Sequence, residues 1–561
     1  MRALPFFVAA ALALTFAGCR GKDTPAPAAS ASLPEPPAPA SLVAELSVGN
    51  PKQTWLSLRQ LGGDLAQALP SSLPVLLATS LSLPPAAAGN LDEGVPLVGA
   101  LLSRPDSAEP DLVLGMHVVS GGELVASLTL GDAAKFRRVE LGPRVQRLVS
   151  APGAPDLDGA LGVSGNYLLL ASRPEALRDA GRFVAESVSK RARTEPGLSL
   201  STSQGKLGGV LARRLRELWQ ARRGELGARA QAERQARGRP ADFAEPEALL
   251  AGADGTIESW LGVLESSRAL SLNVSPEPTR LRVELTLAPG ESGVAAQLSK
   301  DLVVGPTTPL LALPRQTNAA LLWRSDEASA ATEPSALADS LGKLFGARLT
   351  EAQGKKTSDA LSRFSKAHHG ASVLALLPTR SPSLLLTFEL KDTEAFLQAC
   401  PDLLALLELP PVSGWLAGVW GKPSIKLLPK GADGAESARL RFQRVPGARP
   451  ALPATLSVRW LARDGVGRVL ISADEATGFA DLANLPSLGQ AGFFSQPQLG
   501  LGDQTAFALL ADLRLLVPVG SDDAPFLLTF GKQAERMSLA LDLSPAALPA
   551  LVRGFALDRS P

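Results

Sequence analysis

Two segments, one near the middle of the chain and one near its end, alternate apolar and polar residues in the pattern of a β-hairpin. They are Leu270–Leu287 and Leu527–Leu543, with polar turns expected at Pro276-Glu277 and Gly531-Lys532. Apolar residues recur at every second position, so each hairpin should bury one face and expose the other. The two segments lie about 256 residues apart, which suggests an internal repeat.

Three further pairs of segments recur in the same order. They are Leu42–Trp55 with Leu310–Trp323, Val125–Phe136 with Thr387–Phe396, and Leu169–Ala176 with Val469–Ala476, at separations of about 268, 260 and 300 residues. In the second pair, an alternating strand should run into a helix capped by Asp132 or Asp392, because a carboxylate there accepts from free backbone amides. The shared order predicts an internal duplication.

The changing separations predict insertions in both copies. The second copy gains roughly 40 residues between Phe396 and Val469, and the first gains roughly 44 between Ala176 and Leu270. Helical periodicity is found at 174–187, 333–349 and 392–400, without the regular strand–helix alternation of a parallel sheet.

We therefore predict an α+β fold made of two similar modules, each a mainly antiparallel sheet packed with helices. The modules should span residues 41–300 and 306–558. The first should contain a basic helical insertion at about 207–250.

The N-terminus carries a short segment of the export type. Arg2 precedes an apolar run from Leu4 to Phe16, which is too short for the ~20 residues of a membrane-spanning helix. The run ends in Phe16-Ala17-Gly18-Cys19, and this order resembles the signal peptide of bacterial lipoproteins. The resemblance implies that residues 1–18 are removed and that Cys19 is lipidated and becomes the mature N-terminus. A general secretory signal cut near Ala17 is the alternative.

Residues 19–40 are rich in Pro, Ala and Ser and lack the apolar content needed for a core. We expect a disordered tether in extended geometry that holds the body away from the membrane. Arg20 stands where lipoproteins retained in the inner membrane carry Asp, so the resemblance implies an outer-membrane location facing the periplasm. The body resembles large uncharacterised envelope lipoproteins built from repeated strand–helix modules, which implies no particular activity.

Composition narrows the possible classes of protein. The 561 residues are 45% apolar and 20% charged, as in ordinary globular modules, and a net charge of +1 argues against a protein that binds polyanions over its whole surface. Lipidation would use one of the two cysteines, Cys19, which leaves Cys400 without a disulfide partner. Cys400 ends an apolar helical stretch before Pro401, so we interpret it as a buried residue and not as a reactive thiol.

The three histidines do not form a site in the sequence. His117 lies in an apolar strand, where we expect a hydrogen-bonded structural role. His368 and His369 end a helix, and adjacent helical side chains diverge by ~100°, so the pair is poorly placed to share a metal. We predict no metal site and no cofactor.

Candidate nucleophiles lack companion motifs. Ser203 with Lys206, and Ser340 with Lys343, have the spacing of serine acyltransferases without the strand motif that completes such a site. The segment Gly162–Gly165 is an incomplete nucleophile elbow. We therefore predict no catalytic residue.

The predicted insertion contains an unusually basic helix. Its early turns carry an apolar stripe of Leu211, Leu215, Leu218 and Trp219, which ends past Leu226. One interpretation is a solvated helix stabilised by pairs of glutamate and arginine four residues apart. The other is contact with anionic lipid headgroups, lipopolysaccharide or an acidic envelope protein. The candidate contact residues are Arg213, Arg214, Arg222, Arg223 and Arg229.

These features predict a lipid-anchored protein of the cell envelope that binds or scaffolds and is not an enzyme. The expected partner is the membrane, through the N-terminal lipid, with anionic lipid or an envelope protein as further candidates and no nucleic acid. A periplasmic carrier of an apolar ligand or lipid is an alternative, because Ala- and Leu-rich strands could enclose a cavity. An enzyme of unrecognised type is a third possibility.

Overall fold

The computed structural model describes residues 35–549 except 64–69, 82, 105–106, 131–133, 143, 152–158, 203–205, 238–245, 326–348, 379–382, 432, 444–452, 491, 497–498 and 514–522. The predicted signal segment, Cys19 and the tether up to residue 34 therefore lie outside the described residues. So do Asp132, Ser203, Ser340 and Lys343, and the predicted helix 333–349 as far as residue 348.

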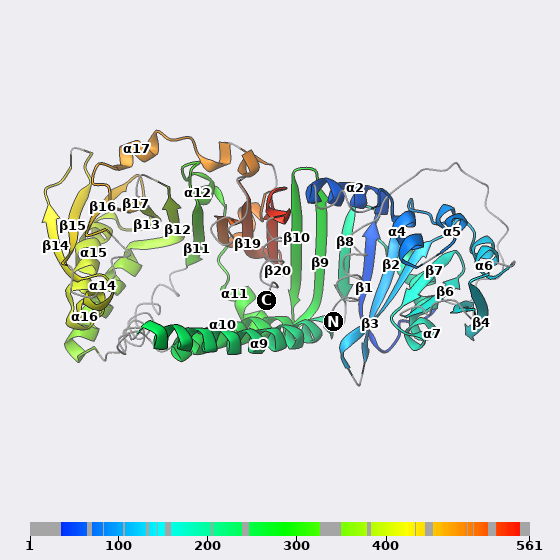
Figure 1. The fold of residues 1–561 in the computed structure, drawn as a ribbon. Coiled ribbons are helices and arrows are strands. Elements are labelled where there is room, and N and C mark those ends of the chain that lie inside the picture. The colour runs from blue at the N-terminus through cyan, green and yellow to red at the C-terminus, as the bar shows by residue number, and fades with distance from the viewer. Residues whose placement is uncertain are drawn as a thin grey trace.

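The described strands form one antiparallel sheet of 20 strands, and the molecule is elongated across it (Figure 1). The first copy contributes β1 (Leu42–Gly49), β2 (Leu97–Arg104), β3 (Ser107–His117), β4 (Phe136–Gly142), β5 (Val145–Ser150), β6 (Ala160–Ser164), β7 (Tyr167–Ala171), β8 (Gly197–Thr202), β9 (Ser267–Glu277) and β10 (Arg280–Pro289). The second contributes β11 (Ala319–Ser325), β12 (His368–Leu377), β13 (Ser383–Leu390), β14 (Lys422–Leu428), β15 (Glu436–Gln443), β16 (Thr455–Arg463), β17 (Val466–Ser472), β18 (Thr505–Asp512), β19 (Pro525–Gln533) and β20 (Arg536–Leu543).

Both copies arrange their strands in the same order. Hydrogen-bonded neighbours run β4-β5-β6-β7-β3-β2-β1-β8-β9-β10 in the first copy. In the second copy they run β14-β15-β16-β17-β13-β12-β11-β18-β19-β20. Strands β10 and β20 pair antiparallel and join the copies. The predicted α+β fold with two similar, mainly antiparallel modules is confirmed, and the modules share one continuous sheet.

The register of the pairings also repeats. The last pair before the turn is Glu277 with Arg280 in one hairpin and Gln533 with Arg536, 256 positions further on, in the other. At the join Glu284 pairs with Ala540, also 256 positions apart, so corresponding residues meet there as they would on a twofold axis. Both turns lie slightly later than the sequence predicted, at 278–279 and 534–535.

The same register can be followed across each copy. One row of paired neighbours comprises Leu161, Leu170, Leu114, Gly99, Leu46, Leu200, Leu272 and Leu285. Its counterpart comprises Trp460, Val469, Leu386, Leu374, Leu321, Leu509, Leu528 and Leu541. We call the side of the sheet that carries these rows the leucine face. A shift of one residue in any pairing would move that strand's apolar side chains to the other face.

Two of the alignments made from sequence were wrong, and the alignment of Leu169–Ala176 with Val469–Ala476 was shifted by one residue, because strand pairing matches Leu170 with Val469. By strand pairing Trp323 in β11 corresponds to Val48 in β1, whereas Trp55 lies in the following helix α2 (Pro51–Gly62). Residues 125–129 belong to helix α6 (Gly121–Thr129) and not to a strand. The true counterpart of Asp392 is Ser120, because each caps the helix after the third strand by accepting from a backbone N–H. Local apolar patterns were similar enough to be matched out of register.

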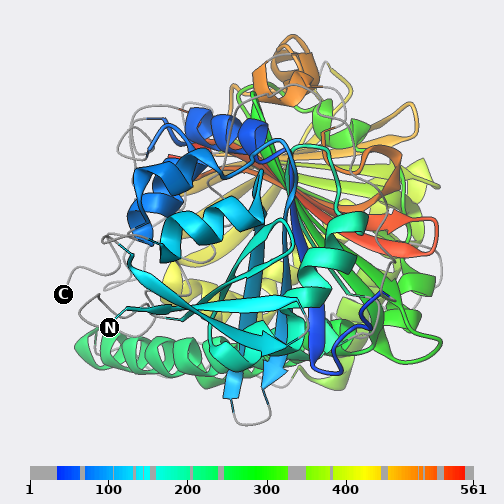
Figure 2. The same cartoon turned by 90° about the vertical axis from the view of Figure 1, so that its right-hand side faces the viewer.

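Helices cover both faces of the sheet (Figures 1 and 2). On the leucine face α4 (Leu73–Ser80), α5 (Pro85–Gly89) and α6 cover the first copy, and α14 (Glu351–Ala367) and α15 (Thr393–Ala405) cover the second. The opposite face packs against α7 (Pro174–Phe183), which continues as the π-helix η1 (Val184–Val188), in the first copy. In the second copy it packs against α12 (Thr308–Leu311) and α17 (Phe479–Ala483). The predicted helices 174–187 and 392–400 are thus present.

Candidate functional site

The predicted basic helix is present and folds as one arm of a helical hairpin. Helix α9 (Lys206–Arg237) is followed by α10 (Pro246–Glu265), and the pair lies along one edge of the body in Figure 1. At its base Leu207 and Ala212 are buried with Leu261 and Leu264 of α10 against the leucine face of the central strands. The Trp260 ring meets Phe530 of β19 edge-on at 5.2 Å. The insertion of the first copy therefore also contacts the second copy.

Acidic residues of α10 hold the inner side of α9. Arg216 donates to Glu258 at 2.9 Å and to Glu265 at 3.2 Å. The Trp219 indole donates to Asp254 at 2.7 Å, and Arg223 donates to the same carboxylate at 2.9 Å. These bonds keep the pKa of Asp254 and that of Glu258 below their usual values. Sequence reasoning missed these partners, although their spacing (254, 258, 265) places them on one side of a helix.

The outer side of α9 remains basic and exposed. Arg213, Arg214, Arg222 and Arg229 are all exposed. Arg214 pairs with Glu217 at 3.0 Å and Arg222 with Glu225 at 2.7 Å, both within the same helix. Exposed pairs of this kind contribute about 0–1 kcal/mol. Of the five predicted contact residues, the structure turns only Arg223 toward α10.

The chain enters the body beside the first turn of α9. Lys206 Nζ donates to the carbonyl of Ala40 at 2.9 Å. Slightly upstream, Ser187 Oγ donates to the carbonyl of Pro36 at 3.3 Å, and Glu35 lies 3.9 Å from Lys190. The last residues of the predicted tether thus lie next to the base of the hairpin.

The histidines have structural partners. His117 Nδ1 lies 2.9 Å from Asp92 Oδ2, and its ring meets Tyr167 edge-on at 5.4 Å, which confirms the expected hydrogen-bonded role. His368 follows the last residue of α14, and its Nδ1 lies 2.8 Å from the carbonyl of Phe364. Within the described residues no three His, Cys, Asp or Glu side chains gather as metal ligands would.

The remaining sequence candidates belong to the scaffold. Ser164 is buried at the end of β6, and Gly165 occupies the turn to β7 with φ 56°, so this segment is a hairpin turn and not a strand-to-helix elbow. Cys400 is a buried free cysteine, as predicted, and burial raises its pKa to about 12. The helix does not stop before Pro401 as predicted, because α15 continues through that residue to Ala405.

Two buried carboxyl groups were not singled out from the sequence. Asp542 is fully buried at the junction of the copies, where it accepts the Gly500 N–H at 2.8 Å and lies near Arg280 and Arg282. Desolvation nevertheless raises its pKa. Glu93 is also buried, and desolvation raises its pKa to about 7 despite the nearby Lys52. Neither the Asp92-Glu93-Gly94 segment nor the single Asp542 within an apolar strand gave a sequence signal for these environments.

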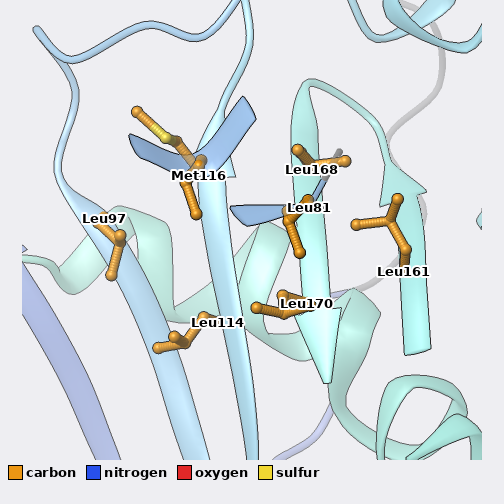
Figure 3. Close-up of a pocket in the computed structure, with 8 residues that line it drawn as sticks. Leu81, Leu97, Leu114, Met116, Leu161, Leu168 and Leu170 are labelled. Carbon is orange, nitrogen blue, oxygen red and sulfur yellow. The ribbon is translucent and has the colours of Figure 1, made fainter. Parts of the chain in front are cut away.

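A small apolar cavity lies under α4 on the leucine face of the first copy (Figure 3). It measures about 30 Å³, and its lining consists of Leu77, Leu81, Leu97, Leu114, Met116, Leu161, Leu168 and Leu170. Such a space is large enough for roughly one water molecule, and an apolar lining keeps a cavity of this kind dry. The lining side chains come from four strands, helix α4 and the residue that follows it, Leu81, so no local sequence pattern indicates the cavity.

Comparisons with known proteins assign this chain to no family. No family model matches the chain, and no curated protein does. Two solved structures, crystal forms IV and III of TP0453, each give a TM-score of 0.20, at 12% and 13% identity. Each match covers 45% of this chain. It covers 97% of the TP0453 chain in form IV and 98% in form III. At this level of similarity nothing is transferred from TP0453. Among the described helices, none is both long and apolar enough to span a bilayer.

Proposed function

We propose that this protein is a lipid-anchored, non-catalytic binding or scaffolding protein of the cell envelope. The observation that supports the proposal best is where the N-terminal segment joins the body. Residues 35–40 contact Ser187, Lys190 and Lys206, and Lys206 begins the helix that carries the exposed basic surface. An anchor at Cys19 would keep that surface within one tether length of the membrane, with the twenty-stranded sheet as a continuous platform.

The anchor is tested by metabolic labelling with a palmitate analogue. We expect label in the wild-type chain and none in Cys19→Ser, because a serine hydroxyl does not form the thioether to diacylglycerol. The proposed outer-membrane location predicts that the labelled chain sediments with the outer membrane and stays protected from protease added to whole cells. Equal labelling of Cys19→Ser would overturn the anchor.

The cavity under α4 supports a second candidate, a carrier of an apolar ligand. Its lining has no charged side chain, and leucine and methionine adapt their shape to an aliphatic chain. At about 30 Å³ the space would have to widen by movement of α4 before it could accept such a chain. Mass spectrometry of an organic extract of purified Cys19→Ser protein should then detect a stoichiometric lipid. A lipid-free extract would favour the scaffolding function.

A further inference from the structure

The apolar stripe that seats α9 on the sheet continues along the helix beyond its buried base. Leu207 is buried and Leu211 partly buried against the central strands. Leu215, Leu218 and Leu226 extend the stripe, but their side chains are 46%, 53% and 36% exposed. At 3.6 residues per turn these three leucines project within ~80° of one another. The outer half of the helix therefore presents an apolar strip to solvent.

Arginines lie within and beside this strip. By the same helical geometry Arg222 and Arg229 fall inside the ~80° sector of the leucines, and Arg214 lies just outside it. All three are exposed. Arg216 and Arg223, by contrast, point to α10 and are engaged by its carboxylates. The hairpin thus separates its arginines into an inner set that fixes the two helices together and an outer set that accompanies leucines.

We propose that this outer strip of α9 docks on the surface of an anionic phospholipid bilayer. Leucines would enter the boundary between headgroups and acyl chains, while the arginines alongside would bind lipid phosphates, as in interfacial amphipathic helices. Arg214 and Arg222 can exchange their weak pairs with Glu217 and Glu225 for lipid phosphates at a small cost in free energy. An acidic protein would match the arginines, but it would leave the exposed leucines without an apolar partner.

The position of the N-terminal segment agrees with this orientation. Lys206, at the start of α9, contacts Ala40, so a membrane anchor upstream would reach the bilayer on the hairpin's side of the body. The inference goes beyond the proposed anchor because it does not require Cys19 to be lipidated. With an anchor in place, the hairpin determines how the body lies on the membrane.

Binding to vesicles tests the proposal in the full-length Cys19→Ser chain, which removes any acyl anchor. We expect co-flotation with vesicles of phosphatidylcholine and phosphatidylglycerol at 7:3, little with phosphatidylcholine alone, and release in high salt. The triple variant Arg214→Gln, Arg222→Gln, Arg229→Gln should bind on the order of 100-fold more weakly, at ~fivefold per arginine near an anionic surface. A matched triple of exposed arginines elsewhere, Arg178→Gln, Arg363→Gln, Arg463→Gln, should bind as the parent does.

A fluorescent probe on α9 distinguishes insertion from purely electrostatic contact. Cys400 is buried, so a cysteine introduced at Leu218 or Gln220 can be labelled selectively with the environment-sensitive dye NBD. On anionic vesicles the dye at Leu218→Cys should shift to the blue. The dye at Gln220→Cys, which projects from nearly the opposite side of the helix, should not. The proposal would be overturned if the two arginine triples bound vesicles equally. It would also be overturned if the chain bound without a blue shift at Leu218→Cys, or if self-association of the chain gave that shift without vesicles.

Discussion

The two copies share a strand frame but fill it with different side chains. On the leucine face of the first copy Met116 and Leu124 pack in a cluster that is aliphatic except for Phe136. Phe388 occupies the position of Met116, and Phe396 occupies that of Leu124, in a cluster with Phe364 and Trp460. The rings of Phe364 and Phe388 meet edge-on at 5.0 Å. The aliphatic core leaves a small cavity, whereas the rings of the second copy pack directly against one another.

This difference shows that the two copies share their strand register but not the identity of their core side chains. Strand pairing fixes which face every side chain occupies, so a shift of one residue would move a whole row of leucines to the opposite face. The register is the same in both copies. The identity of a core residue has only to satisfy its immediate neighbours and can change with the helix that covers it. The connection from β8 to β9 has diverged most, because it holds α9 and α10 in the first copy, whereas β18 and β19 are separated by residues 513–524 only.

Truncating the corresponding helix residues gives the largest expected effects. Phe396 and Leu124 are both fully buried four residues after the cap of the helix that follows the third strand. Phe396→Ala should reduce the free energy of unfolding by about 3–5 kcal/mol, and Leu124→Ala by about 2–5 kcal/mol. Urea titration followed by tryptophan fluorescence measures both. A cost below about 1 kcal/mol for Phe396→Ala would contradict the aromatic core.

Asp111 in β3 and Ser383 in β13 occupy equivalent positions but make different polar contacts. In the first copy buried Asp111 binds Arg173 at 2.6 Å and Ser172 at 2.9 Å, whereas in the second Ser383 and Ser472 bond to each other at 2.9 Å. Arg173→Leu should cost about 3 kcal/mol, because it leaves a buried carboxylate without its cation. Ser383→Ala, the milder change, should cost about 1 kcal/mol. Equal costs in urea titration would indicate that Asp111 is solvated in solution.

Glu93 should make the first copy sensitive to pH. Its pKa is raised from 4.5 to about 7 by burial, so the folded state holds the proton more tightly than the unfolded state. Its contribution to stability is therefore fully present below pH 4.5 and is lost as pH rises through about 7. Glu93→Gln should raise the free energy of unfolding by about 2 kcal/mol at pH 8.5 and by little at pH 4.5. Parallel stability curves for the two proteins across this range would show that the carboxyl is not desolvated.

Exchanging the matched residues Met116 and Phe388 should have the smallest effect. Met116→Phe would extend into the neighbouring cavity and stabilise the chain by up to about 1 kcal/mol, unless α4 is displaced. Phe388→Met should destabilise it by about 1 kcal/mol through loss of ring contacts. Thermal unfolding of the single and double variants measures both. Destabilisation by Met116→Phe would indicate that the cavity cannot accept a ring.

Several features could be predicted from the sequence because they depend on local chemistry. The hairpins β9-β10 and β19-β20 follow from period-two alternation, and the burial of Cys400 follows from its apolar surroundings. The basic helix was visible as a run of arginines behind a short leucine stripe. The alignments of Leu42–Trp55 with Leu310–Trp323 and of Val125–Phe136 with Thr387–Phe396 failed because a helix such as α6 and a strand can share a short apolar run. Only strand pairing shows which residues are equivalent.

The candidate site could be predicted only in part. Arg213, Arg214, Arg222 and Arg229 are exposed, as the interpretation of a surface helix requires, but the engagement of Arg223 by Asp254 depends on α10 folding back. Burial of Glu93 and Asp542 likewise depends on segments distant in the chain.

The order of apolar and polar residues by itself determined the α+β class, the twofold repetition and the existence of the long arginine-rich helix, since each depends on spacing along the backbone. Only the tertiary structure decided that the copies fuse edge to edge through β10 and β20, and which side of α9 stays in water. Both outcomes depend on contacts between residues far apart in the chain. These contacts form, and contribute to stability, only once the whole sheet has assembled.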